Sequence, residues 1–141
     1  MFEEKKRINR ALINVCNTYH VCGYSVYIFR FRLSTRPSVA FTDAPPFRTI
    51  WIQQKLLKIL DDDELKWLIA HEIGHHELNL GHKPVEIHIV VDKFAADKFG
   101  AKTGIRVLSK VWNLIKNNSP PYTERDFNKR ISALKNMIEV K

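Results

Sequence analysis

The stretch from Asp61 to Leu80 constrains the fold most. It begins with the signals of a helix start and continues as an apolar helix that is interrupted by a few polar residues. Asp61 and Glu64, three residues apart, predict a capping box at the start of a helix. The run of three aspartates also favours a helix N-terminus through the helix dipole. We therefore expect a helix from about Asp61 to about Leu80, closed by Gly81.

This helix contains His71, Glu72 and His75 between apolar neighbours. Histidines at positions i and i+4 project from one face, so both imidazoles can reach the same metal ion. Glu72 is rotated by about 100° from His71, which places its carboxylate beside a metal-bound water without making it a ligand. The motif predicts a Zn²⁺ site with His71 and His75 as ligands and Glu72 as the catalytic general base of peptide hydrolysis.

The segments around this helix predict one α+β domain over residues 1–141. Helical spacing of apolar residues predicts a helix over residues 3–18, and β-branched and aromatic runs predict strands. The expected strands cover residues 24–33, 38–42 and 48–53, followed by a short helix near Leu60 and by helices over residues 84–100, 105–115 and from 123 onward. We expect a small, mostly antiparallel sheet packed on the metal-binding helix and on supporting helices.

Composition and charge restrict the setting of the chain. No apolar run approaches the roughly 18 residues that a membrane span requires, and the charged N-terminus lacks the apolar core of a secretory signal. We therefore expect no membrane span and a cytoplasmic location, in which Cys16 and Cys22 stay reduced. The net charge is +8, but basic residues occur along the whole chain, so nucleic acid is an open but not favoured partner. The oligomeric state is left open.

The residues from Ser38 to His82 resemble the gluzincin metallopeptidases. An extended S-V-A-F-T segment precedes a strand, a leucine-rich turn, D-D-D-E-L and H-E-I-G-H, in an order most similar to the CAAX prenyl protease and heat-shock membrane protease family and to the short minigluzincins. Later segments, F-A-A-D ending at Asp97 and S-P-P followed by R-I-S-A-L, resemble the family's remaining motifs. The resemblance implies a zincin-like fold, bound Zn²⁺ and a peptide or protein substrate that pairs with the edge strand near residues 39–42.

One departure from the family pattern concerns the third metal ligand. The family has a glutamate four residues before the position of Asp97, where this chain has Lys93. A protonated lysine is a poor zinc ligand, so we expect Asp92 to be the third ligand. His88, one turn earlier, and His82 are the alternatives. The resemblance also implies that Asp97 hydrogen-bonds a ligand imidazole or a helix end.

A second departure is Ser119, which stands where the family often has a histidine that steadies the oxyanion; Tyr122 is a candidate to replace it. The sequence as a whole predicts a zinc-dependent endopeptidase. An inactive zinc-binding or partner-binding relative is one alternative, motivated by Lys93 and Ser119. A regulatory protease of the repressor-cleaving type is another, because the histidines from His75 to His82 fit the pattern of that class.

Overall fold

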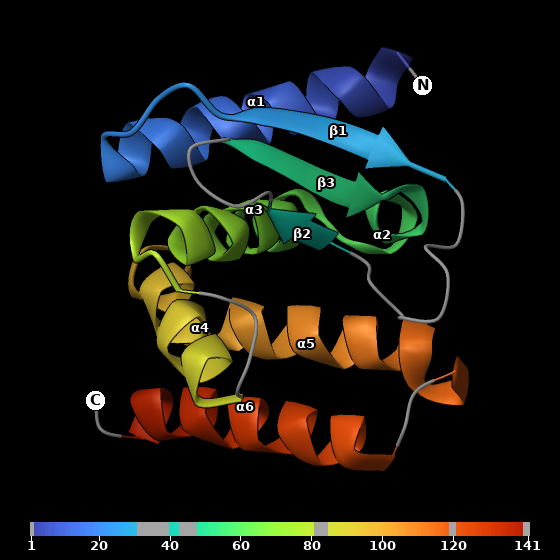
Figure 1. The fold of residues 1–141 in the computed structure, drawn as a ribbon, viewed down its shortest axis with the longest axis vertical. Helices are drawn as coiled ribbons and strands as arrows, with labels where there is room; N and C mark the ends of the chain where they lie inside the picture. The colour runs from blue at the N-terminus through green and yellow to red at the C-terminus, as the bar shows by residue number, and fades with distance from the viewer. Residues whose placement is uncertain (1, 31–39, 43–47, 81–84, 119–120, 140–141) are drawn as a thin grey trace.

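The computed structural model describes residues 2–30, 40–42, 48–80, 85–118 and 121–139 (Figure 1). Its elements are α1 (Phe2–Tyr19), β1 (Ser25–Phe29), β2 (Ala40–Thr42), β3 (Thr49–Gln53), α2 (Gln54–Ile59), α3 (Asp62–Glu77), α4 (Val85–Phe99), α5 (Ala101–Ile115), the 3₁₀ turn η1 (Lys116–Asn118) and α6 (Pro121–Glu139). The chain is mostly helical with one small sheet, in agreement with the expected α+β class.

The sheet has the strand order β1-β3-β2. β1 and β3 are parallel, with Tyr27 opposite Trp51, whereas the shorter β2 is antiparallel to β3, with Phe41 opposite Trp51. The expectation of a mostly antiparallel sheet is therefore wrong for the longer pairing. Parallel strands need a long crossover, and residues 30–48 are long enough to return the chain to the same end of the sheet.

α3 is the centre of the fold. Figure 1 shows it between the sheet with α1 on one side and α5 and α6 on the other. The sheet faces it with alternate residues, so Ile50 and Ile52 are fully buried while Trp51, between them, points to the opposite face. Apolar residues on every side of α3 are buried, as expected for a helix that is enclosed on all sides.

The predicted start of α3 is confirmed, but its end comes earlier than expected. Asp61 is the N-cap, and the reciprocal hydrogen bonds with Glu64 form the capping box. The helix ends at Glu77, and Asn79 then adopts a left-handed conformation with a φ of 53°. Asparagine tolerates that conformation better than most residues, so the chain can turn directly after the helix. Gly81, the expected helix end, lies outside the described residues.

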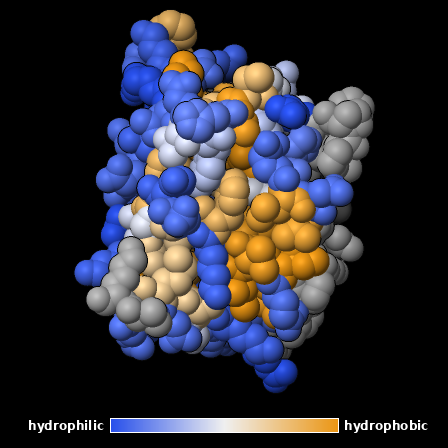
Figure 2. Space-filling model, turned by 90° about the vertical axis from the view of Figure 1, so that its left-hand side faces the viewer, coloured by the Kyte–Doolittle hydropathy of each residue, from blue (hydrophilic) through white to orange (hydrophobic). Residues whose placement is uncertain are grey.

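Apolar surface gathers on the side of the molecule where α4 lies (Figure 2). Val90 of α4 is 49% exposed, and Leu78, just after α3, is 39% exposed. Grouped apolar side chains on a surface are typical of contact areas. Among the helices that the structure describes, none has the length and apolar character needed to cross a membrane.

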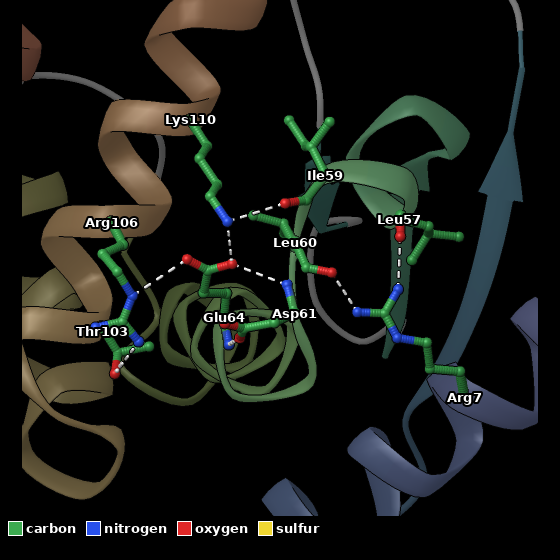
Figure 3. Close-up of polar contacts among 9 residues, drawn as sticks. All are labelled: Arg7, Leu57, Ile59, Leu60, Asp61, Glu64, Thr103, Arg106 and Lys110. Carbon is green, nitrogen blue, oxygen red and sulfur yellow. Dashed lines mark hydrogen bonds and ion pairs between the residues drawn. The ribbon is translucent and has the colours of Figure 1, made fainter.

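A fully buried carboxylate fixes the start of α3 (Figure 3). Glu64 Oε1 accepts hydrogen bonds from the Asp61 backbone N–H at 2.8 Å and from Lys110 Nζ at 2.6 Å. Arg106 Nε lies 3.3 Å from the other oxygen. Both cations come from α5, so this carboxylate joins the helix cap to the neighbouring helix.

Arg7 supports the same junction from α1 (Figure 3). Its guanidinium donates to the backbone carbonyls of Leu57 and Leu60, which the end of α2 leaves without helical partners. It also pairs with Asp62 at 2.6 Å. The turn between α2 and α3 is therefore held from both sides by cationic side chains.

Replacing Glu64 by Ala should lower the free energy of unfolding by about 2 kcal/mol, because the variant loses a capping acceptor and leaves Lys110 without its carboxylate partner. Asp63→Ala is the matched control in the same helical turn. Its side chain is 77% exposed and meets only Lys66 at 3.9 Å, so the expected change is under about 0.5 kcal/mol. Urea unfolding measures both. Equal losses for the two variants would contradict this role of Glu64.

Candidate metal centre

Three histidines from two helices meet between α3 and α4. His71 and His75 lie one turn apart on α3, and each is 4% exposed. His88 of α4 stacks on the His71 ring with centroids 5.8 Å apart, and its edge meets the His75 ring at 5.1 Å. One ligand nitrogen from each of the three lies within 4.8 Å of the others. The described residues thus hold a set of three imidazoles that could bind one metal ion.

The spacing of this cluster suits a zinc ion. The Nε2 atoms of His71 and His75 are 3.0 Å apart. Two nitrogen ligands of a tetrahedral zinc ion, each at about 2.0–2.1 Å, lie roughly 3.3 Å from one another. Three imidazoles with a fourth position left open are also a ligand set that zinc takes in catalytic sites. The residues present therefore fit the expected ion.

The other nitrogen of each α3 histidine faces an oxygen acceptor. His75 Nδ1 lies 3.3 Å from the Leu80 carbonyl oxygen, and His71 Nδ1 lies 2.9 Å from Asp92 Oδ1. An acceptor close to Nδ1 favours the tautomer that carries its proton there, which leaves the Nε2 lone pair for a metal. The contact of His75 has the geometry of a hydrogen bond, whereas His71 Nδ1 lies close to Asp92 without that alignment.

Asp92, the expected third ligand, lies on the Nδ1 side of His71 and is 1% exposed. Arg130 of α6 grips its carboxylate with Nε at 2.7 Å and a terminal nitrogen at 2.8 Å. Burial by itself raises the pKa of Asp92, but the charge and hydrogen bonds of Arg130, together with His71, outweigh it and hold that pKa well below its usual range. Asp92 therefore stays ionised beside His71, and the third nitrogen of the cluster comes from His88 instead.

The rotation of α4 explains this arrangement. Its buried face carries Val91, Asp92, Ala95 and Ala96. Lys93 is exposed, and so is Asp97, whose nearest charged partner is Lys98 at 3.9 Å. The expectation that Asp97 would hydrogen-bond a ligand imidazole is therefore wrong, and Asp92 occupies that place.

The spacing of His88 and Asp92 by one helical turn is the sequence feature that could have predicted which face of α4 meets α3. The two residues are four positions apart, so they lie on one face of α4. Three further candidates stay untested: His82 and Ser119 lie outside the described residues, as does the side chain of Tyr122.

Glu72 lies beside the cluster without being part of it. Its Oε2 atom is 3.9 Å from His71 Nε2, and the residue is 3% exposed. A carboxylate at this distance can contact a molecule bound between the imidazoles and itself.

Close packing keeps the two helices and the His71 ring in place. A Cβ at Gly74 would stand 2.8 Å from the Phe94 ring and 3.0 Å from Val91, so α4 can approach α3 only at a glycine. On the other side, the Trp67 ring stacks on His71 with centroids 5.6 Å apart and lies against Gly104. The histidines are therefore held between closely packed side chains and backbone of the neighbouring helices.

Comparison with protein families gives a match to this region. The profile of peptidase family M48 matches residues 29–116, which is more than half of the chain and includes α3 and α4 with all three histidines. A comparison with curated proteins gives no match. The chain therefore belongs to peptidase family M48, a family of zinc-dependent metallopeptidases.

Proposed function

We propose that the protein is a zinc-dependent endopeptidase in which His71, His75 and His88 hold the metal and Glu72 is the general base. The observation that carries the proposal is the meeting of three imidazoles within 4.8 Å, with a buried carboxylate 3.9 Å from one of their ligand atoms. Family membership supports metallopeptidase chemistry in general. The assignment of individual residues rests on their geometry.

Each residue of the centre has a task in peptide hydrolysis. A zinc ion, when bound, supplies a water of lowered pKa and polarises the peptide carbonyl. The Glu72 carboxylate accepts the proton of the attacking water and then delivers it to the leaving amine. Burial of Glu72, His71 and His75 limits the access of bulk water to these contacts, whereas His88 is only half-buried.

Asp92 and Arg130 act through His71 in this proposal. The carboxylate fixes the plane and tautomer of the imidazole, and Arg130 keeps that carboxylate charged and in place. They are positioning residues, because neither is part of the cluster of ligand nitrogens.

The substrate is a peptide or protein in extended conformation. Among the described strands, β2 forms one edge of the sheet and contacts α3, which carries the catalytic motif. An extended peptide can pair with the backbone of such an edge strand, which would align a scissile bond with the metal centre. The apolar surface on the side of α4 offers additional contacts for apolar substrate residues (Figure 2).

One of the two arguments for an inactive zinc-binding or partner-binding relative is weakened. It rested on Lys93 at the position of the family's third ligand, but Lys93 is exposed, and His88 supplies a third imidazole from the buried side of the same helix. Activity measurements decide between the two readings.

Metal content separates the candidates for the third ligand. The purified wild-type protein should carry one zinc ion per chain by elemental analysis, and His88→Ala should lose it. Asp92→Asn should retain the ligand set but bind zinc roughly 10- to 100-fold more weakly, since it perturbs only the partner of His71. His20→Ala, an exposed histidine at the end of α1, is the control that should keep its metal. Loss of zinc in Asp92→Asn with retention in His88→Ala would make Asp92 the ligand.

Replacing Glu72 by Gln should abolish proteolysis while zinc stays bound. The amide cannot accept the proton of the water, so cleavage of an unfolded protein substrate should slow at least about a hundredfold. Glu86→Gln, an exposed residue in the first turn of α4, is the matched control and should cleave normally. An unchanged rate in Glu72→Gln would remove this residue from the mechanism. A zinc-loaded wild type that cleaves nothing would favour the inactive metal-binding relative.

Replacing Arg130 by Met should leave the Asp92 carboxylate buried without its main counter-charge. We expect the free energy of unfolding of the metal-free protein to fall by about 3 kcal/mol, together with weaker zinc binding through His71. Lys129→Met, an exposed neighbour on the same helix, should change neither quantity. Urea unfolding and zinc titration provide the two measurements. Arg130→Met with wild-type stability would show that Asp92 is not held as described.

A further inference from the structure

The end of α3 is a tight turn around one left-handed residue. Asn79 has a φ of 53°, and its backbone N–H donates to the His76 carbonyl at 3.1 Å. The next residue, Leu80, donates its backbone N–H to the His75 carbonyl at 3.0 Å. These two hydrogen bonds around a left-handed residue form a Schellman motif, which ends a helix by reversing the direction of the chain.

The reversal brings a backbone acceptor to a candidate metal ligand. The carbonyl oxygen of Leu80 lies 3.3 Å from His75 Nδ1. In a helix that continued through Leu80, this carbonyl would point toward the C-terminal end, whereas the His75 side chain leans toward the N-terminal end. The two groups therefore meet because the chain turns back at Asn79.

Leu80 thus holds both the backbone and the ring of His75. Its N–H donates to the His75 carbonyl, and its own carbonyl meets the imidazole. A carbonyl oxygen can only accept, so this contact requires the ring proton on Nδ1 and leaves a lone pair on Nε2. His75 Nε2 lies 3.0 Å from His71 Nε2. The turn therefore favours the tautomer that presents a ligand nitrogen beside His71.

A contact from the sheet fixes the last turn of α3. Tyr24, which directly precedes β1, is buried. Its hydroxyl donates to Glu77 Oε2 at 2.6 Å and lies 2.9 Å from His76 Nδ1. Helix ends commonly fray, and this contact ties the end of α3 to the neighbouring element. The turn at Asn79 therefore starts from a fixed position.

We propose that Asn79 is a positioning residue of the metal centre, because its left-handed backbone places the Leu80 carbonyl on His75 Nδ1. This inference rests on the proposed function, in which His75 is a metal ligand. Asn79 is exposed, which leaves its backbone conformation as the feature that acts on His75. Glycine and asparagine adopt a positive φ with little strain, whereas a β-branched residue is a clear outlier there.

The end of α1 provides a matched turn without a metal ligand. His20 has a φ of 57° and is exposed. Its backbone N–H donates to the Asn17 carbonyl at 3.4 Å, and the Val21 N–H donates to the Cys16 carbonyl at 3.0 Å. The hydrogen bonds have the same spacing as those around Asn79, but α1 carries none of the three clustered histidines. Substitutions at His20 therefore report the strain of such a turn alone.

The test is the zinc affinity of the full chain, measured by competition with a chromogenic chelator, beside urea unfolding of the metal-free protein. Asn79→Val and His20→Val should both lower the midpoint of unfolding, because valine is strained at a positive φ. Asn79→Val alone should also weaken zinc binding, by roughly 10- to 100-fold. Asn79→Gly should bind zinc like the wild type. Asn79→Ala, which is less strained than valine, should shift zinc affinity in the same direction and serves if the valine variant does not fold.

A second measurement does not depend on zinc. Nuclear magnetic resonance of the imidazole nitrogens in the metal-free protein should show the His75 proton on Nδ1 in the wild type, in Asn79→Gly and in His20→Val. Asn79→Val and Asn79→Ala should lose this preference, because the Leu80 carbonyl no longer faces the ring.

The outcomes separate this inference from the proposed function. A wild type that binds no zinc would overturn the proposed metal centre and this role with it. If the wild type binds zinc, three results would each overturn the role of Asn79 alone. These are folded valine and alanine variants with wild-type zinc affinity and tautomer, equal weakening in His20→Val, and Asn79→Gly as weak as Asn79→Val.

Discussion

The contact between Arg130 of α6 and Asp92 of α4, with Asp92 also beside His71 of α3, joins three helices at the candidate metal centre. A buried carboxylate is unfavourable unless a counter-charge and hydrogen bonds satisfy it, and Arg130 provides both from α6. The satisfied carboxylate then faces His71 of α3 while it belongs to α4. A residue of the last helix therefore holds the carboxylate that lies beside an imidazole of the central helix.

The same principle of paired charge governs the other end of α3. Its first turn is acidic, and cations from two neighbouring helices meet it: Arg7 from α1, and Arg106 and Lys110 from α5. These contacts neutralise part of the negative charge of α3 and tie the helix to its surroundings.

Local patterns predicted what local forces decide. The capping box of Asp61 and Glu64 and the helical position of His71 and His75 are both visible in the sequence, and the structure confirms them. The direction of β1 relative to β3 depends on the path of the chain through residues 30–48, which no local pattern describes.

The residue of α4 that joins the two histidines of α3 was harder to predict for a related reason. Lys93 and Asp92 are neighbours in sequence but point about 100° apart on a helix. Which of them faces the histidines depends on how α4 rests against Gly74 and on the grip of Arg130 from another helix. In the same way, the neighbours Trp51 and Ile52 lie on opposite faces of the sheet, and only the packing of the sheet on the helices decides which face is buried.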